Sequence, residues 1–329
     1  MKPAAKRRLF LAVLIVLLSA GMLASLLIGP VRTTPGDLAN LLAGRDSGLA
    51  TIFIDLRLSR AVLALVVGAA LALSGAILQG YFQNPMADPF VVGASSGASF
   101  GAVLCLFLGI NITVAGFSLQ SLFAFGAGFG LVSFVYAVSR RKEAFKLESL
   151  LLTGIAAGAM ASALTSFMLF MKADSFEQAV FWLLGSFALA DWKQVWVIAP
   201  YVLLGLAASQ VLAKDMNLLA MGDETAKALG CPVDRVRRIF LALATLLAAL
   251  SVSVSGVIGF VGLVIPHWVR ILIGPDHRRL FAYSALAGGT FLVACDLMAR
   301  TVLSPTELPI GVITAAVGAP FFIYLLNRK

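Results

Sequence analysis

The chain has 329 residues, of which 60% are hydrophobic and only 12% are charged, whereas globular domains average about 45–50% and about 25%. Its mean hydropathy is +0.97. A water-soluble core cannot bury this much apolar surface, so the composition excludes a soluble enzyme, a disordered chain and a nucleic-acid-binding domain. We therefore predict an all-α polytopic membrane protein in which residues 1–329 form a single transmembrane domain.

The first predicted element is an apolar helix at 9–28, which follows four basic residues within the first eight positions. This order resembles a secretory signal, but such signals have an apolar core of only about 7–15 residues. We therefore predict an uncleaved membrane helix whose basic end lies in the cytoplasm.

Nine further apolar segments approach the length of roughly 20 residues that spans a bilayer. They lie at 61–80, 92–110, 114–138, 149–171, 194–213, 239–257, 259–273, 281–303 and 308–326. The segment at 259–273 is the least regular, because it is short and contains Pro266. Ten spans that start inside return the C-terminus to the cytoplasm, which predicts a multi-pass protein of the cytoplasmic (inner) membrane.

The distribution of charge agrees with this orientation. The predicted cytoplasmic segments hold 18 of the 25 Lys and Arg residues, while the 16 acidic residues divide equally, giving about +10 inside and −1 outside. Cytoplasmic loops carry such an excess of basic residues. The basic residues left on the outer side are Arg32, Arg45, Arg57, Arg60, Lys172, Lys193 and Arg300.

Small residues recur at every fourth position in three of the spans. Because lipid provides no hydrophobic drive for helix association, such stripes let helix backbones approach closely. We interpret each stripe as packing within one subunit, with a subunit interface or a pathway wall as the alternative. The stripes are Ala64, Gly68, Ala72, Ala76 and Gly80; Gly93, Gly97 and Gly101; and Gly154, Gly158, Ser162 and Ser166.

Two proline pairs, at 84–89 and 304–309, interrupt the helical pattern. Proline removes a backbone donor, and irregular backbone at membrane depth must be buried in protein or line a wet cavity. The predicted topology places the first pair at the inner mouth and the second at the outer mouth. The first pair precedes a Gly-rich helix start, so a gate and an ordinary surface turn remain equal alternatives there.

The polar segment at 214–238 is the one substantial cytoplasmic loop in the predicted topology. It is typical of two short helices, in which Asp223 caps the first, Gly230 ends it in the left-handed conformation, and Pro232 starts the second. The loop is too short to bury its own apolar side chains, which predicts a partner surface, with packing against the spanning helices as the alternative. These apolar residues are Leu218, Leu219, Met221 and Leu229.

Few residues offer chemistry within the membrane. Cys105, Cys231 and Cys295 are far apart and odd in number, which favours small buried side chains over a disulfide or a metal site. His267 and His277 both fall toward the cytoplasm without a metal or nucleophile constellation, which disfavours an intramembrane enzyme. The sequence contains no nucleotide-binding loop, so any ATPase must be another polypeptide.

An ion-coupled secondary transporter or a channel is the alternative function class. Ion coupling requires ionisable groups in mid-membrane. The predicted spans contain almost no ionisable side chains. Asp296 is the exception, and we expect it to pair with Arg300 near the outer end. The placement of Asp296 near the outer end, rather than in mid-membrane, disfavours an ion-coupled transporter or a channel.

Long composite motifs cover nearly the whole chain after the first helix. On them the chain resembles FecCD-type permease subunits, a family that imports ferric siderophores, haem and cobalamin with ATP-binding cassette (ABC) ATPases. The motifs are DLRLSRAVLALVVGAALALSGAILQG, NPMADPFVVGASSGA, LLLTGIAAG, FWLLGSF, the polar loop, GFVGLVIPHWVR and ELPIGVITAAVGAPFFIYLL. One departure occurs before the fifth span, where Leu147 and Glu148 stand in place of a small hydroxyl pair found in cobalamin permeases.

The resemblance implies the type II ABC importer fold, with about ten helices per subunit and a pathway between two subunits. It implies a homodimer, with a heterodimer of paralogues left open, two cytoplasmic ATPases and an extracytoplasmic substrate-binding protein. The chain itself is then a transport subunit rather than an enzyme, and no cofactor is expected. Ferric siderophore is the first choice of cargo on family frequency, with cobalamin and haem as alternatives.

The resemblance also implies roles for three groups of residues. It implies that the coupling helices fit a cleft of the ATPase through Leu219, Met221, Asp223, Glu224, Ala226, Leu229 and Gly230. It implies an inner gate at Asn84, Pro85 and Met86. It implies that Arg57, Arg60 and Arg300 pair with carboxylates of the binding protein, whereas snorkelling to the interface is the alternative for arginines at helix ends.

Overall fold

The computed structural model describes residues 3–29, 31, 33–44, 48–110, 112–114, 117–140, 147–172 and 176–326. Within these ranges regular structure is helical apart from one antiparallel pair of two-residue strands, β1 (Thr113–Val114) and β2 (Phe117–Ser118). Several basic residues used in the topology argument lie outside the described residues: Lys2, Arg32, Arg45, Arg141, Lys142, Lys146, Arg328 and Lys329.

Each of the ten predicted spans contains a helix, which confirms the predicted fold class. Among the described residues, seven helical stretches are long and apolar enough to cross a membrane, whereas α5, α13 and α15 are shorter. The ten helices are α1 (Pro3–Leu27), α4 (Ser59–Tyr81), α5 (Ala94–Leu108), α6 (Leu119–Ser139), α7 (Leu147–Met171), α9 (Trp192–Val211), α12 (Val233–Ser255), α13 (Val261–Ile273), α14 (His277–Ala299) and α15 (Ile310–Leu326).

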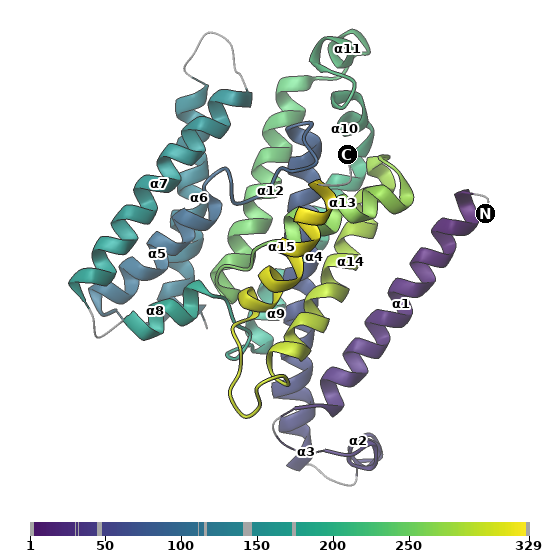
Figure 1. The fold of residues 1–329 in the computed structure, drawn as a ribbon, viewed down its shortest axis with the longest axis vertical. Coiled ribbons are helices and arrows are strands. Elements are labelled where there is room, and N and C mark those ends of the chain that lie inside the picture. The colour runs from purple at the N-terminus through teal and green to yellow at the C-terminus, as the bar shows by residue number, and fades with distance from the viewer. Residues whose placement is uncertain are drawn as a thin grey trace.

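Shorter elements occupy the two ends of the bundle. At one end, α2 (Pro35–Leu42) precedes α3 (Gly48–Ala50) and η1 (Thr51–Leu58), which run without a break into α4. At the other end lie α10 (Ala213–Leu219) and α11 (Asp223–Ala228). Helix α8 (Phe176–Leu183) follows α7 and lies away from α10 and α11, toward the end that carries α2 (Figure 1). Figure 1 shows that α1 begins, and α15 ends, toward the end that carries α10 and α11. We call the two ends the α2 end and the α11 end.

Helix α4 forms the centre of the bundle and is buried along most of its length, between α12 and α14 (Figure 1). Its stripe of small residues allows the close approach that the sequence predicts. Within the stripe, a Cβ added to Gly68 would lie 2.4 Å from the Gly288 oxygen of α14. Gly75, outside the stripe, is also closely packed, because a Cβ there would lie 1.9 Å from the Gly262 oxygen of α13. Both distances are shorter than van der Waals contact, so only glycine fits where these backbones cross.

The second and third stripes differ from each other. Gly97 and Gly101 pack on the backbone of α6, as expected for contact within one subunit. In the third stripe, Gly154 packs against the backbone at Val91, but Ser162 and Ser166 are exposed on α7. Part of the third stripe is therefore left uncovered by this chain.

Candidate functional site

Of the two short helices that the polar loop predicts, the first is α11, and the second, from Pro232, is the start of the spanning helix α12. The other short helix at the α11 end, α10, is not predicted. Gly222 and Gly230 bracket α11 with φ angles of 100° and 81°, in the left-handed region that favours glycine. The sequence predicts that Asp223 caps this helix, but the structure corrects that role. Asp223 is the first helical residue, and its side chain accepts a 2.6 Å ion-pair hydrogen bond from Arg237 of α12. The bond ties the start of α11 to a spanning helix.

The apolar residues of the loop divide into two groups. Met221 and Leu229 are 62% and 58% exposed, and Glu224 is exposed beside them. Leu219 and Ala226 are instead 1% and 0% exposed, because they pack in the hydrophobic core of the chain itself. For Leu219 the alternative, packing against the spanning helices, therefore holds, and Ala226 is buried in the same way. They support the loop from beneath.

The region around Asp223 also buries a thiol. Cys231 is 5% exposed between α11 and α12. Burial raises the pKa of this thiol, and the nearby carboxylates of Asp215 and Asp223 raise it further. Cys231 is therefore a neutral packing residue at neutral pH.

Hydrogen bonds connect α10 to two spanning helices. Gln83, two residues after the end of α4, donates from Nε2 to the backbone oxygen of Leu219 at 2.5 Å. Asn217 donates from Nδ2 to Asp276 Oδ1 at 2.9 Å and accepts from the backbone N–H of His277 at 3.0 Å. These bonds link α10 to the end of α4 and to the start of α14.

The predicted inner gate begins one residue after Gln83. Asn84 is exposed, and its Oδ1 accepts a 2.9 Å hydrogen bond from the Met86 N–H, which closes a tight turn. Pro85 and Met86 remain partly exposed. Asp88 accepts from the Phe90 N–H at 2.8 Å, and burial raises the pKa of its carboxyl to about 6. The 84–86 turn is thus accessible and directly joined to the segment bonded to α10.

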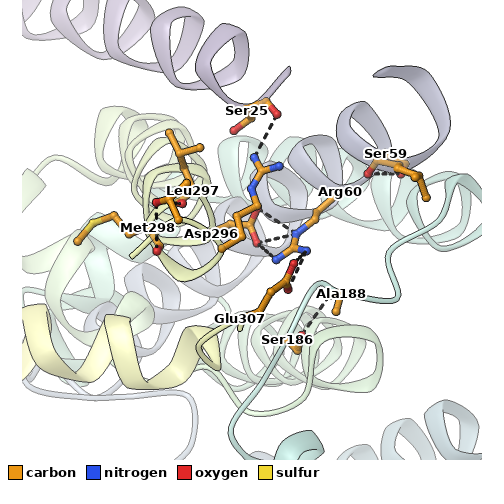
Figure 2. Close-up of polar contacts among 12 residues, drawn as sticks. Ser25, Ser59, Arg60, Ser186, Ala188, Asp296, Leu297, Met298 and Glu307 are labelled. Carbon is orange, nitrogen blue, oxygen red and sulfur yellow. Dashed lines mark hydrogen bonds and ion pairs between the residues drawn. The ribbon is translucent and has the colours of Figure 1, made fainter. Parts of the chain in front are cut away.

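The α2 end carries a cluster of arginines and carboxylates. Figure 2 shows Arg60 between Asp296 and Glu307, with nitrogen to oxygen distances of 2.9 Å to each carboxylate. Asp296 is 1% exposed and also lies 3.4 Å from Arg300, as the sequence predicts. Asp296 is therefore compensated by two guanidinium groups.

The other arginine of this end, Arg57, binds the region that follows α1. It donates to the backbone oxygens of Leu26 and Val31 and to Thr33 Oγ1 at 2.6 Å. Arg300 donates to the Ser25 oxygen at 3.2 Å. Two buried arginines thus satisfy carbonyls at the end of α1, where a helix has no further backbone donors of its own.

These contacts correct the exposure expected for the three arginines. Arg57 and Arg300 are 5% and 3% exposed, and the side chain of Arg60 is 11% exposed. The three arginines therefore neither snorkel to the membrane interface nor point freely outward. Their first partners lie within the chain.

A large cavity, of about 580 Å³, lies toward the α2 end between α6, α8, α9 and α12. Its wall is rich in hydroxyl and amide groups, including Ser118, Gln120, Gln194 and Ser253, with Trp182 beside them.

The three cysteines are free and buried. Over the described parts of the chain, no group of three His, Cys, Asp or Glu side chains is placed to hold a metal ion.

The sequence does not single out the residues that connect these sites. Gln83, Asn217 and Arg237 have partners 136, 60 and 14 residues away, which no local pattern indicates. Glu307 stands out in the sequence only as part of a proline turn and not as a partner of Arg60. The spacing of four between Asp296 and Arg300 is the available signal, and it leads to the correct pair.

Comparison with known proteins identifies the family of the chain. Residues 16–328 match the profile of the FecCD transport family. The cobalamin import system permease protein BtuC of Halobacterium salinarum is 45% identical over 275 residues, covering 83% of this chain and 73% of the relative. The hemin transport system permease protein HmuU of Yersinia pestis is 38% identical over 331 residues, covering 98% and 96%.

A solved structure shares the fold over almost the whole chain. It is described as an inward-facing conformation of a metal-chelate type ABC transporter, and it is 33% identical with a TM-score of 0.87. The alignment covers 98% of this chain and 100% of the other. The likeness therefore extends from the spanning helices to the loop helices at the α11 end. With the family match over 16–328, these findings establish that the chain belongs to the FecCD transport family.

Proposed function

We propose that the chain is the membrane-spanning permease subunit of an ABC importer that moves a metal chelate inward across the cytoplasmic membrane. The observation that carries the proposal is the hydrogen bond from Gln83 to Leu219. It joins the loop helices at the α11 end to the 84–86 turn in a chain of this family. A movement imposed on α10 and α11 is then transmitted to the inner mouth.

The proposed orientation places the α11 end in the cytoplasm and the α2 end outside. The excess of basic residues in the segments assigned to the cytoplasm supports it. The start of α1 and the end of α15 then both face the cytoplasm, because they point toward α11 (Figure 1). The whole chain acts as one transmembrane domain, with 214–238 as its coupling loop.

The proposed ATPase contact is formed by the exposed part of this loop. Met221, Glu224, Leu229 and Gly230 present it, and Asp223 fixes its position through Arg237. Leu219 and Ala226 have a supporting role beneath the surface. Two copies of a separate ATPase would each receive one such loop, and the chain itself hydrolyses no ATP.

A second copy of the chain is proposed to complete the pathway. Helix α7 supports this arrangement, because it exposes large apolar side chains together with the small residues of the third stripe. Among the exposed residues are Leu152, Ile155, Met160, Ser162, Ser166 and Phe167. The proposed inner gate at Asn84, Pro85 and Met86 would then close against its counterpart from the second subunit.

Docking of a substrate-binding protein is proposed at the α2 end. Arg57, Arg60 and Arg300 carry three positive charges against the two carboxylates of Asp296 and Glu307, so the cluster retains a net charge of about +1. An acidic partner surface would be attracted by this field. Because the arginines are bonded internally, the attraction acts through the cluster rather than through free side chains.

The proposed cargo is a ferric siderophore, with cobalamin and haem as the alternatives. Two relatives are named for cobalamin import and hemin transport, so cobalamin and haem remain alternative cargoes. A large chelate bound by shape and apolar contact needs no local ligand motif. In keeping with this, the two cavities beside α6 and α9 are lined mainly by hydroxyl, amide and apolar groups.

The test is uptake by proteoliposomes that contain this chain, its ATPase and its binding protein. A ferric siderophore, cyanocobalamin and hemin are supplied separately, with internal ATP or with an imposed proton or sodium gradient. The proposal expects ATP-dependent accumulation of one chelate and no uptake with a gradient alone. Uptake driven by a gradient in the absence of ATP would establish the secondary-transporter alternative instead.

A further inference from the structure

The end of α4, the end of α6 and the start of α12 enclose a small basic cavity at the α11 end. Its volume is about 180 Å³, and it is lined by Tyr81, Tyr136, Arg140, Asp234, Arg237 and Arg238. Three guanidinium groups line the cavity with the carboxylate of Asp234, and Arg237 also pairs with Asp223, so a net charge of about +1 remains. Such a surplus of positive charge in a confined space favours an anion.

Two side chains that line the cavity each have a buried polar atom without a hydrogen-bond partner among the described residues. These atoms are Tyr81 Oη and Arg237 Nε. Tyr81 is 1% exposed and Arg237 is 5% exposed, so neither atom is solvated at the molecular surface. Buried donors without partners are costly, and an acceptor that enters the cavity would satisfy them.

The rest of the Arg237 side chain is held rigidly. Its guanidinium lies over the Tyr81 ring at 5.2 Å, donates to the backbone carbonyl oxygen of Tyr81 at 3.3 Å, and pairs with Asp223 at 2.6 Å. An anion in the cavity would meet a preorganised donor rather than a mobile arginine.

An apolar groove of about 240 Å³ lies beside the cavity, between α6 and α12. The two spaces share Tyr136 and Arg238, so they lie next to each other along α6 and α12. The groove extends from Arg238 to Thr245, which is about 10 Å along a helix. Its other lining residues are Phe129, Val132, Ser133, Leu241 and Ala242.

The apolar surface extends further toward mid-membrane. Phe129 stacks on Phe125 with ring centroids 6.0 Å apart. Phe125 in turn lines a third cavity of about 370 Å³ between α6, α9 and α12, together with Leu246 and Leu250. An apolar track therefore leads away from the basic cavity in the direction of the helix axes.

From this arrangement we infer that the basic cavity and the groove bind one anionic phospholipid of the cytoplasmic leaflet, with its phosphate at the arginines and an acyl chain between α6 and α12. A basic pocket between spanning helices is suited to an acidic headgroup on this side of a membrane. A free phosphate would leave the groove unused, and a neutral lipid would leave the positive charge uncompensated. The choice of leaflet rests on the proposed function, whereas the site itself does not.

The site shares Arg237 with Asp223, the first residue of α11. A bound headgroup would therefore contact the same guanidinium that positions the coupling loop. Occupancy of the site would stabilise the position of α11 that the structure shows.

Lipid retention by the purified full-length chain tests the inference. Native mass spectrometry is used to compare dioleoyl phosphatidylglycerol with dioleoyl phosphatidylcholine, neither of which requires the ATPase or the cargo. We expect preferential retention of phosphatidylglycerol, and a roughly tenfold loss of that preference in the Arg140→Gln, Arg238→Gln double variant. Arg235→Gln, at an exposed arginine of α12 outside the cavity, is the matched control and should retain the preference.

A groove variant separates the two parts of the site and provides a readout if the double variant is unstable. Ala242→Trp fills the groove and should reduce phosphatidylglycerol retention while leaving the arginines in place. Equal retention of both lipids by the wild type, or an unchanged preference in both the double variant and Ala242→Trp, would overturn the inference.

Two further outcomes would assign the site to another occupant. Displacement of phosphatidylglycerol by inorganic phosphate at millimolar concentration would identify a phosphate site without an acyl chain. Efficient cross-linking of Ala242→Cys between two copies would identify the groove as a subunit interface. Because no measurement in this set involves transport, failure of the lipid site leaves the proposed transport function standing, and the reverse also holds.

Discussion

Gln83 donates a hydrogen bond from its side-chain amide to the backbone oxygen of Leu219, at 2.5 Å across 136 residues of sequence. The bond connects the last residue before the 84–86 turn with the last residue of α10. The side chain that follows a spanning helix thus contacts the loop helix directly. Transmission of a loop movement to the inner mouth is expected to depend on this contact.

Removal of the amide should therefore weaken coupling more than stability. Gln83→Leu keeps most of the side-chain volume but loses the donor, which costs about 1 kcal/mol for one hydrogen bond. We expect ATP hydrolysis by the assembled transporter to continue while chelate uptake per ATP falls several-fold. The measurement is the ratio of uptake to hydrolysis in proteoliposomes, with Gln83→Glu, which retains an acceptor but not the amide donor, as a second variant. An unchanged ratio in both variants would remove Gln83 from the coupling path.

The exposed and buried residues of the coupling loop should respond differently to the same charge. Leu229→Asp places a carboxylate on the exposed surface and should reduce transport and coupled hydrolysis together, by about fivefold or more, without changing the unfolding midpoint. Ala226→Asp places the carboxylate at a site that is 0% exposed and should lower the unfolding midpoint. Thermal unfolding in detergent and ATPase assays distinguish the two. Equal stability of both variants would contradict the burial of Ala226.

The carboxylates at the α2 end should differ in their contribution to stability. Asp296→Asn leaves Arg60 and Arg300 without their buried partner and should destabilise the chain by about 3–5 kcal/mol. Glu307→Gln should cost much less, because the Glu307 side chain is 31% exposed and solvent compensates the change. Denaturant unfolding of the two variants under one detergent condition gives the comparison. A larger effect for Glu307 would reverse the assigned order.

The glycine contacts of α4 provide a packing test. Gly75→Ala would bring a Cβ to 1.9 Å from the Gly262 oxygen and should destabilise the bundle by about 1–3 kcal/mol or more. Gly126→Ala on α6 is the control, because a Cβ there meets nothing within 4 Å, and alanine favours a helix. The unfolding midpoints should therefore shift in opposite directions. Similar midpoints would indicate that α4 and α13 are less closely packed.

The ten spans were predictable from sequence because each is a long apolar run, and the stripe on α4 was predictable because small residues share one helix face. The burial of Leu219 and Ala226 was not, since it depends on neighbours from other helices. The pairing of Arg60 with Asp296 likewise joins residues 236 positions apart. Single-sequence patterns record periodicity along one helix, whereas these contacts are set by the packing of several helices.

Control of the inner mouth by α11 is tested most directly by cross-linking of Met86→Cys between two copies. Cys105, Cys231 and Cys295, which are free and buried, are first replaced by alanine, and yields are compared without nucleotide and with ATP trapped on the ATPase. We predict a yield that changes with trapped ATP, and loss of that change when Leu229→Asp is added. A yield that is the same in both states, or a nucleotide-dependent change that survives Leu229→Asp, would contradict control of the gate by α11.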